Sequence, residues 1–449
     1  MPADSRFDAQ FFKKTYLAED MALHRHQLRN VGSFAFVTDG PHGYHVVDES
    51  SPVAMLTAKC AANWFAEREG ADTIATWIDD ANQRSSLQAD DLILGTRGTV
   101  GKCALVTAEA LPSNLDQDVA RIAIDSEEGL NPIYVLTYLN SRFGQDHIAR
   151  HATGMVQQGI SLAKVREIPV PKLSEDLQSR VSTLVNHALA ARRGSKERQQ
   201  DAQQALLNAL GLSDWTPPEP LTYTALASDA LTSGRLDARF FAPRIRALLN
   251  VLAKDKRIVA NVARQRREKF RPDTCVNFDY IEISDVDGAG AATSTHLACD
   301  EAPSRATWHV RPHDIITSTV RPIRRLSAQI APEQDGFVCS SGFVVVEPQT
   351  IASEVLLTYL RLPVICELLD LFTSASMYPA ITDNDIFNLP VPHIPDGVAT
   401  EVTRSVRDAK VAKARAAAML DAAKRAVEIA IEDSEAAAMA YLAQAEEAI

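Results

Sequence analysis

The sequence contains no run of about 18 apolar residues and no Cys-x-x-Cys motif. A helix that crosses a bilayer needs roughly 20 consecutive apolar residues, so we expect no transmembrane helix and no membrane partner. The first twenty residues are polar and lack the apolar core of a signal peptide, which favours a cytoplasmic protein. Scattered cysteines in such a protein predict buried, reduced thiols and no metal site. The cysteines are Cys60, Cys103, Cys275, Cys299, Cys339 and Cys366.

Motifs that carry catalytic chemistry are also missing. The sequence has no His-Glu-x-x-His and no Gly-x-Ser-x-Gly. Residues 95–102 look like a phosphate loop, but five residues rather than four separate Gly95 from Gly101, and Cys103 stands where a magnesium-binding Ser or Thr belongs. Residues 131–134 approach the Asn-Pro-Pro-Tyr of amino-methyltransferases, yet the second proline is absent and no glycine-rich cofactor loop precedes them. Asn131 and Pro132 instead predict a helix start. We therefore expect a chain without a catalytic centre.

Positive charge is scarce overall but locally concentrated. The formal net charge is −12, which argues against an indiscriminate nucleic-acid binder and leaves a specific one open. The last 22 residues contain no Lys or Arg. Basic residues gather in two places, and these are candidate contact surfaces for an anionic partner. They are Arg264, Arg266, Arg267, Lys269 and Arg271 in one run and Arg321, Arg324 and Arg325 in the other.

An internal repeat organises the chain. Residues 168–171 (Ile-Pro-Val-Pro) return as 389–392 (Leu-Pro-Val-Pro), and residues 136–139 (Leu-Thr-Tyr-Leu) return as 357–360, in both cases 221 positions later. Ile160 and Ile381 keep the same register, and residues 6–12 echo in 235–241 at an offset of 229. Several repeated segments in one order predict two copies of one module, each with a globular part and a helix.

Within each module, short strands and turns precede helices. Residues 91–94, a glycine-rich turn over 95–102 and residues 103–106 predict a strand, turn and strand, and residues 314–325 match them in the second copy. Residues 119–124 and 343–346 predict further strands. We expect a helix from Arg239 to Lys256 and a mostly helical segment from Ala352 to Leu371 with a break at Pro363.

A long helix is predicted after each Pro-x-Pro segment. Residues 174–211 begin with an N-capping Ser174 and end at Gly211, and apolar residues recur in three- and four-residue steps. Residues 398–449 show a similar stripe with few helix breakers. At 1.5 Å per residue the two helices would measure roughly 55 and 75 Å. Their narrow, alanine-rich stripes require a partner helix, and each is the simplest partner for the other. Residues 215–220 are a proline-rich linker.

This layout resembles the specificity subunit of type I restriction–modification enzymes over nearly the whole chain. Residues 314–322, 339–343, 377–381 and 389–392 carry the resemblance in the second copy, and residues 91–102, 154–161 and 168–173 carry it in the first. The resemblance implies an α+β fold in which two similar target recognition domains, built from short strands with helices, are separated by two long helices in an antiparallel coiled coil. Residues 398–449 form a longer helical region than the family leads us to expect.

The resemblance also implies boundaries and partners. Residues 1–173 would form target recognition domain 1, 174–212 spacer helix 1, 213–234 a linker, 235–395 target recognition domain 2 and 396–449 spacer helix 2. Each domain would read one half of a split site in double-stranded DNA, and two methyltransferase subunits would dock around the helices, with restriction subunits in the full complex. S-adenosylmethionine, ATP and magnesium are expected on those partner subunits and no cofactor on this chain.

Candidate DNA contacts follow from turns and polar loops. Arginine and lysine can bind guanine or phosphate, and glutamine, serine and threonine can reach base edges. Each candidate also has a structural interpretation, namely a surface ion pair, a helix cap or a solvated face. The candidates are Arg97, Lys102, Gln157, Gln158, Ser161, Thr38 and His42 in the first module and Thr319, Arg321, Arg324, Arg325, Ser376, Tyr378, Thr382, Arg266 and Arg267 in the second.

Two other functions remain open at this stage. The chain could be a coiled-coil scaffold whose modules bind proteins rather than DNA, and the basic turns discriminate this from DNA reading because a scaffold would not need them. A methyltransferase acting alone is the third possibility, and the missing motifs argue against it.

Overall fold

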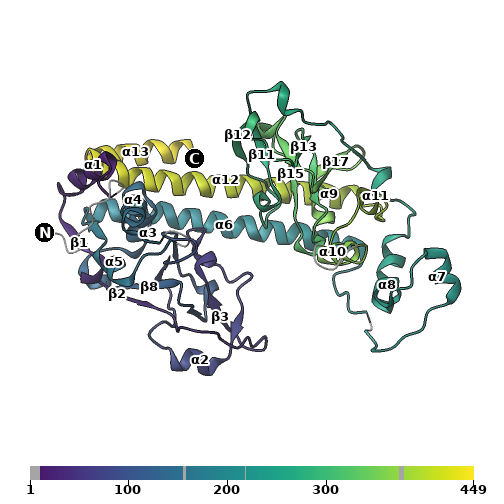
Figure 1. Ribbon diagram of the computed structural model, residues 1–449, viewed down its shortest axis with the longest axis horizontal. Coiled ribbons are helices and arrows are strands. Elements are labelled where there is room, and N and C mark those ends of the chain that lie inside the picture. Colours follow the sequence, from purple (N-terminus) through teal and green to yellow (C-terminus); the bar gives the residue numbers. More distant parts are fainter. Residues whose placement is uncertain (1–10, 155–157, 218, 374–378) are drawn as a thin grey trace. The chain divides into compact units, whose positions relative to one another are not determined.

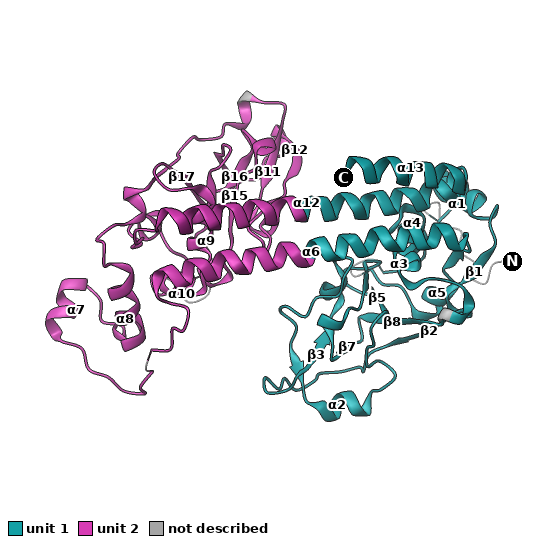
Figure 2. Cartoon of the chain, turned by 180° about the vertical axis from the view of Figure 1, so that it is seen from behind, with its two compact units in different colours: residues 1–192, 413–449 teal, residues 193–412 magenta. Residues whose placement is uncertain are grey.

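The computed structural model describes residues 11–154, 158–217, 219–373 and 379–449, and the chain forms two compact units. Unit 1 combines residues 1–192 with 413–449, and unit 2 comprises residues 193–412 (Figure 2). Each unit therefore contains its globular part and half of each long helix. No helix among the described residues combines the length and apolarity that crossing a bilayer requires.

Unit 1 contains two small sheets and several helices (Figure 1). One sheet has the antiparallel order β2-β8-β5-β6, and the other has the order β4-β3-β7, with β3 antiparallel to β4 and parallel to β7. Strand β1 pairs with β9 apart from both. The strands are β1 Leu28–Asn30, β2 Ala35–Asp39, β3 Val53–Leu56, β4 Thr73–Ile74, β5 Leu92–Gly95, β6 Cys103–Leu105, β7 Ser113–Leu115, β8 Val119–Ile124 and β9 Pro169–Pro171. The shorter helices are α1 Lys14–Leu23, α2 Thr76–Ala81, α3 Pro132–Asn140, α4 Arg142–His151 and α5 Leu162–Glu167.

Unit 2 repeats this topology. Its first sheet has the antiparallel order β10-β17-β14-β15, and its second has the order β12-β11-β16-β13 with the same parallel central pair. Strand for strand in chain order, β10, β11, β12, β14, β15, β16 and β17 match β2 to β8, and β13 is inserted. The strands are β10 Ala263–Gln265, β11 Asn277–Ile281, β12 Thr295–Ala298, β13 Ala306–His309, β14 Ile315–Ser318, β15 Ser327–Gln329, β16 Val338–Ser340 and β17 Phe343–Pro348. The shorter helices are α7 Ala227–Ser233, α8 Pro243–Leu252, α9 Ser353–Leu360, α10 Pro363–Asp370 and α11 Asp383–Phe387.

The repeated sequence segments contact each other in the same way in both units. The Tyr138 hydroxyl donates a 2.6 Å hydrogen bond to the Pro169 carbonyl, and the Tyr359 hydroxyl donates to the Pro390 carbonyl. These tyrosines lie in the repeated Leu-Thr-Tyr-Leu segments on α3 and α9, and the prolines lie in the Pro-x-Pro segments. Because buried polar groups need partners, this contact explains why both segments are kept in both copies. The predicted duplication is confirmed.

Two long antiparallel helices belong to both units. Helix α6 spans Glu175–Leu210 and α12 spans Asp396–Glu432. In unit 1, residues 177–188 of α6 pack against residues 416–431 of α12, and in unit 2 residues 202–210 pack with Val402 and Val406. The start of one helix therefore lies beside the end of the other, as expected. The Leu177 amide donates to the Ser174 hydroxyl, and Gly211 ends α6 with φ of 69°, which confirms both predicted ends.

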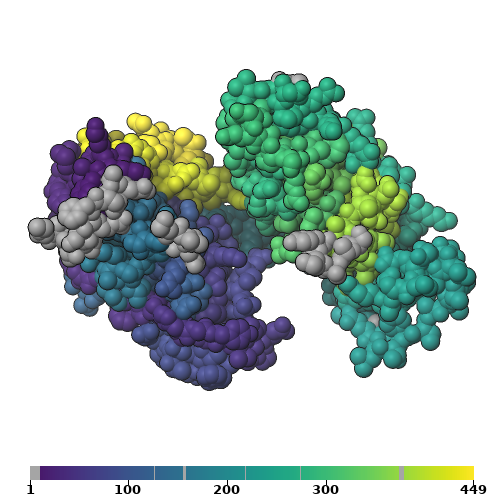
Figure 3. Space-filling view, viewed as in Figure 1, coloured from purple at the N-terminus to yellow at the C-terminus, as the bar shows by residue number. Residues whose placement is uncertain are grey.

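The prediction of one helix over 398–449 is wrong. Helix α12 ends at Glu432, and Ser434 caps a separate helix α13, Glu435–Ala448, by accepting a hydrogen bond from the Ala437 amide. Helix α13 buries Ala438 and Leu442 in the core of unit 1 and lies beside α12 and α1 (Figures 1 and 3). The Glu435 carboxylate accepts hydrogen bonds from the Ser174 amide, where it faces the positive end of α6.

The repeated segments 6–12 and 235–241 begin their modules similarly where the structure describes them. Phe11 and Phe12 meet edge to face with ring centres 5.1 Å apart, and Phe240 and Phe241 do the same at 5.1 Å. The single helix expected from Arg239 to Lys256 is instead a short 3₁₀ turn, Ala238–Phe241, followed by α8. Pro243 explains the division, because proline removes an interior hydrogen bond but is favoured at a helix start. The break expected at Pro363 is confirmed between α9 and α10.

One cysteine prediction is wrong. Cys60, Cys103, Cys339 and Cys366 are buried free thiols, but Cys275 and Cys299 form a disulfide with a Cα–Cα distance of 6.0 Å. The pairing follows from strand register, because β11 and β12 are antiparallel with Asn277 opposite Ala298, which brings the two flanking cysteines together.

Candidate nucleic-acid interface

In unit 1, the glycine-rich basic loop connects β5 to β6. Gly98 and Gly101 adopt positive φ angles of 73° and 85°, a conformation that suits glycine, so the loop turns tightly. Lys102 is exposed and has no side-chain partner among the described residues. Arg97 is half exposed and forms an ion pair with Asp118 at 3.3 Å. We call residues 96–102 basic loop 1.

In unit 2, the corresponding loop connects β14 to β15, and we call residues 319–325 basic loop 2. Here the positive φ angles fall on arginines, with 51° at Arg321 and 61° at Arg325. A side chain in this conformation costs on the order of 1 kcal/mol relative to glycine. The Arg325 Nε donates to the Arg361 carbonyl at 2.7 Å. Within the described part of the chain, the side chains of Arg321 and Arg324 have no hydrogen-bond or ion-pair partner, so both can bind an external anion.

Each basic loop pairs with the segment before its Pro-x-Pro. The Ile160 amide donates to the Thr96 carbonyl at 3.0 Å, and the Ile381 amide donates to the Thr319 carbonyl at 2.9 Å. Isolated antiparallel bridges join Arg97 to Gly159 and Val320 to Ala380. The structure thus brings together, in each unit, two groups of residues that the sequence predicted separately. Gln158 is exposed beside basic loop 1, whereas Gln157, Ser376 and Tyr378 lie outside the described residues.

Ser161 and Thr382 cap helices. The Ser161 hydroxyl accepts from the Lys164 amide at the start of α5, and the Thr382 hydroxyl accepts from the Asp385 amide at the start of α11. The capping interpretation of both residues is therefore confirmed, and their exposed positions keep DNA contact as a prediction. The Thr319 hydroxyl donates to the Gly342 carbonyl at 3.0 Å, so its proton is used in a hydrogen bond within unit 2.

Arg266 and Arg267 are bound by carboxylates. The Arg266 Nε lies 2.7 Å from the Asp314 Oδ2, and its Nη2 lies 3.1 Å from Glu347. Burial raises the pKa of Asp314, and the hydrogen bonds from Arg266 oppose that rise. Arg267 pairs with Asp383 at 2.5 Å. Arg266 thus holds a buried aspartate of unit 2, whereas Arg267 forms a surface ion pair.

Unit 1 has an equivalent of the Arg266 pair. Asp91 and Arg121 form an ion pair at 2.7 Å with both side chains less than a tenth exposed. Each aspartate stands immediately before the strand that leads to a basic loop, β5 or β14. The strand entering each basic loop is therefore preceded by a buried aspartate that an arginine neutralises.

The turn that carries His42 leaves the sheet at the same end as basic loop 1. Strands β2 and β5 both pair with β8, and Asp39 and Leu94 both lie opposite Ala120. Thr38 is buried on β2. His42 is largely exposed and contacts Asp39 at 3.1 Å. The structure therefore places His42, but not the Thr38 side chain, where a ligand of basic loop 1 could reach it.

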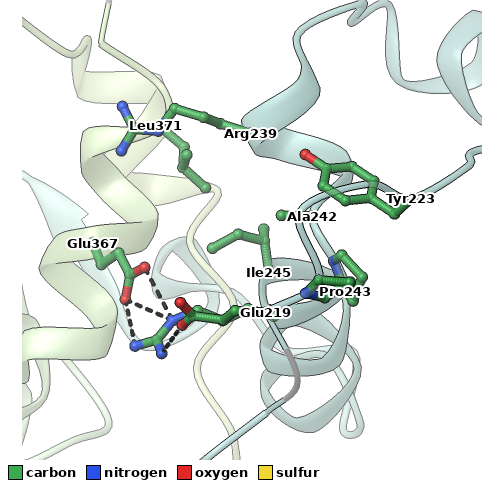
Figure 4. Close-up of a pocket in the computed structure, with 10 residues that line it drawn as sticks. Glu219, Tyr223, Arg239, Ala242, Pro243, Ile245, Glu367 and Leu371 are labelled. Atoms are coloured by element: carbon green, nitrogen blue, oxygen red, sulfur yellow. Dashed lines mark hydrogen bonds and ion pairs between the residues drawn. The ribbon is translucent and has the colours of Figure 1, made fainter.

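A separate cavity of about 230 Å³ lies in unit 2, beside the linker (Figure 4). The Arg244 guanidinium bridges Glu219 at 2.7 Å and Glu367 at 3.0 Å, and these hydrogen bonds raise the pKa of Arg244. Figure 4 shows both carboxylates directed at this guanidinium. The Arg244 guanidinium thus joins the linker to α10 beside this cavity.

Sequence reasoning missed the side chains that bond the main chain at the end of basic loop 2 and directly after basic loop 1. Asn140 donates to the Cys103 carbonyl in unit 1, and Arg361 donates to the Arg325 carbonyl in unit 2. A signal was present, because each residue directly follows a repeated Leu-Thr-Tyr-Leu segment. The shared role of these two residues could not be predicted, because Asn and Arg differ chemically.

Comparisons with known proteins find similar chains among solved structures. No protein-family model and no curated protein sequence matches this chain. The S subunit of a type I restriction–modification system from M. genitalium matches with a TM-score of 0.40 and 12% identity, over 90% of this chain and 95% of that one. The HsdS subunit from Thermoanaerobacter tengcongensis matches with a TM-score of 0.30 and 14% identity, over 91% and 97%.

A third similar chain comes from a structure on complex assembly and conformational transition of the type I R-M system. It matches with a TM-score of 0.28 and 15% identity, over 93% of this chain and 97% of that one. All three solved structures come from type I restriction–modification systems, the family that the sequence resembles.

Proposed function

We propose that this chain is the DNA sequence-specificity subunit of a type I restriction–modification complex, or of a related phage-defence methyltransferase complex. The observation that carries the proposal is the duplication: two units share one strand order, and each presents a basic loop at the same place in that order. Two similar but unequal readers on one chain suit a DNA site with two different halves.

The proposal assigns base and phosphate contacts to the loop ends of the sheets. Arg321 and Arg324 have side chains available for an anion, and Lys102 is their equivalent in unit 1. Guanine and phosphate both accept hydrogen bonds from such residues. Gln158 and His42 are proposed as neighbouring contacts in unit 1. Arg97 would exchange its Asp118 partner for DNA.

In this proposal the helix pair sets the spacing between the two half-sites and docks two methyltransferase subunits. This chain is non-catalytic and acts in the cytoplasm, and it binds no cofactor. Its partners would supply adenine methylation with S-adenosylmethionine, and DNA cleavage with ATP and magnesium. The net charge of −12 leaves much of the phosphate binding to those partners.

The test uses the chain assembled with its methyltransferase partner. The assembly should bind duplex DNA at a split site, and log affinity should fall linearly with log salt concentration. Methylome sequencing of cells with and without the chain should identify that site. An assembly that binds all duplex sequences equally would disprove the proposal.

A coiled-coil scaffold that does not read DNA is the second candidate, and the paired helices α6 and α12 favour it. Two double variants separate the candidates: Arg97→Ala with Lys102→Ala, and Arg321→Ala with Arg324→Ala. If the chain reads DNA, each double variant should abolish recognition of one half-site while partner assembly persists. A scaffold would assemble and function unchanged with either.

A further inference from the structure

The residue that follows each repeated Leu-Thr-Tyr-Leu segment is bonded to the main chain at the end of a basic loop. Arg361 bonds Arg325, the last residue of basic loop 2, and Asn140 bonds Cys103, the residue directly after basic loop 1. In unit 2 this residue is Arg361, at the end of α9, and it is only 6% exposed. Its Nη1 donates to the carbonyls of Arg325 at 2.7 Å and Ser327 at 2.9 Å, and its Nη2 donates to the Gly288 carbonyl. One buried guanidinium thus joins basic loop 2, the start of β15 and the turn at 287–290.

The contact runs in both directions. The Arg325 Nε donates to the Arg361 carbonyl at 2.7 Å, so each arginine holds the main chain of the other. Gly290 packs against the Arg361 side chain, because an added Cβ there would lie 3.3 Å from its Nε. Arg325 has the strained φ of 61°. These bonds hold the last residue of basic loop 2 in a conformation that it would otherwise rarely adopt.

In unit 1, amide side chains bond the main chain at the end of basic loop 1. Asn140 occupies the position equivalent to Arg361 and donates to the Cys103 carbonyl at 2.9 Å. The Gln145 Nε2 donates to the Gly101 carbonyl at 2.8 Å. The two carbonyls flank Lys102, so amide side chains fix the main chain on both sides of the exposed lysine.

The residue after the repeated Leu-Thr-Tyr-Leu segment therefore bonds the main chain at the end of the loop in both units. It does so through a guanidinium in unit 2 and through an amide in unit 1. A loop that reads bases must place its side chains to within a fraction of an ångström, which requires a fixed main chain. We propose that Arg361 and Asn140 are positioning residues that set the sequence preference of basic loops 2 and 1 without touching DNA. This inference rests on the proposed function and adds which buried residues determine specificity.

The experiment measures sequence discrimination at each half-site. The full chain, assembled with its methyltransferase partner, is titrated with the duplex target found by methylome sequencing and with duplexes changed at single base pairs. Arg321→Ala first identifies the half-site that unit 2 reads. Arg361→Lys keeps the buried charge but loses the planar fork, and Arg361→Gln removes the charge. Tyr359→Phe is the matched control, because it removes one hydrogen bond from the same helix without contacting basic loop 2.

Both Arg361 variants should lose about tenfold in discrimination at the unit 2 half-site, the scale of one base-pair preference. Discrimination at the other half-site should be unchanged. For Arg361→Lys the slope of affinity against salt should also stay at the wild-type value, because no phosphate contact is removed. Arg321→Ala should instead reduce that slope if Arg321 binds phosphate. Tyr359→Phe should keep full discrimination even where it lowers the unfolding temperature.

Asn140→Ala makes the reciprocal test in unit 1 and keeps the proposal testable where Arg361 variants fail to fold. It should weaken discrimination at the half-site that Lys102 contacts and leave the other unchanged. Folded Arg361 and Asn140 variants that discriminate as the wild type does, or that lose discrimination equally at both half-sites, would overturn the inference. A wild-type assembly that shows no discrimination would instead overturn the proposed function itself.

Discussion

Arg321 adopts a positive φ, a backbone conformation that glycine adopts without strain. The main chain at this position therefore favours glycine, although the residue present carries a long, charged side chain. Basic loop 1 places Gly98 and Gly101 at its positive φ angles, which shows that the loop can be built without this strain. Strained residues of this kind cluster at functional sites. Under the proposed function, DNA binding by the guanidinium accounts for an arginine at this position.

Replacing this arginine should separate stability from DNA binding. We expect Arg321→Gly and Arg321→Ala to weaken DNA binding equally, because both remove the guanidinium. Arg321→Gly should be more stable than Arg321→Ala by about 0.5–1 kcal/mol, because relief of the Cβ strain outweighs the larger unfolded-state entropy of glycine, which acts in the opposite direction. Denaturant unfolding and DNA titration of the two variants check this. Equal stability of the two would show that the φ of 51° carries no strain.

Glu19 gives unit 1 a pH dependence. It lies on α1 and is 7% exposed, and burial together with a hydrogen bond to Asp146 raises the pKa of its carboxyl to about 7. Arg142, 3.2 Å away, opposes this rise. Because the folded pKa exceeds the ordinary value of 4.5, the neutral carboxyl stabilises unit 1. That contribution is complete below pH 4.5 and is lost as the pH rises through 7.

The unfolding temperature of the wild type should therefore fall between about pH 4.5 and 7, and Glu19→Gln should remove this part of the fall. Thermal unfolding followed by circular dichroism at constant ionic strength measures both curves. Glu69→Gln is the control, since it removes a carboxylate that is exposed in the same unit. Parallel curves for wild type and Glu19→Gln would contradict the assignment.

At the scale of elements, the sequence predicted the segments that occur in both modules. It missed the contacts that depend on how strands far apart in the sequence pair. The Leu-Thr-Tyr-Leu and Pro-x-Pro segments were visible because Tyr138 and Tyr359 need identical partners. The disulfide was not, because only the pairing of β11 with β12 brings Cys275 to Cys299. The ion pairs of Arg266 and Arg267 were missed for the same reason, since their carboxylates lie far along the chain.

The end of α12 was missed for a different reason. Apolar residues continue across the turn at helical spacing, from Val427 and Ile431 to Ala438 and Leu442, so periodicity alone predicts one helix. The local signal was Ser434 followed by Glu435, a capping residue and an acid in the first turn. Helix α13 thereby packs into the core of unit 1.

Packing of α13 should contribute measurably to the stability of unit 1. Leu442 is fully buried, so Leu442→Ala should lower the free energy of unfolding by about 2–3 kcal/mol. Met439, on the same helix but 37% exposed, should tolerate Met439→Ala within about 0.5 kcal/mol. Urea unfolding of both variants makes the comparison. Equal, small losses would mean that α13 is not held against the core.

At the scale of the whole molecule, α6 and α12 each pass from one unit to the other without a break (Figure 2). Under the proposed function, these helices set the number of base pairs between the half-sites. Deleting seven residues from α6 at the 192/193 boundary and seven from α12 at the 412/413 boundary keeps the packing face, because seven residues make two turns. It shortens the pair by roughly 10 Å.

The shortened chain should therefore recognise the same two half-sites with a spacer about three base pairs shorter, at 3.4 Å per base pair. The preferred spacer length is measured by titrating the chain, assembled with its methyltransferase partner, with duplexes whose spacers differ in length. Deleting seven residues from α6 alone is the control and should disrupt folding. An unchanged spacer in the double deletion would show that the helices do not measure the site.

The bonds that hold each unit together and the residues proposed to read DNA are largely different sets. Tyr138, Tyr359 and the Asp91–Arg121 pair stabilise the two units, while the positive φ angles fall on glycines in basic loop 1 and on arginines in basic loop 2. Under the proposed function, a lineage carrying such a gene could exchange one reader and inherit the other intact. Half of its target would change in a single crossover, and invading DNA adapted to the ancestor would meet an unfamiliar specificity.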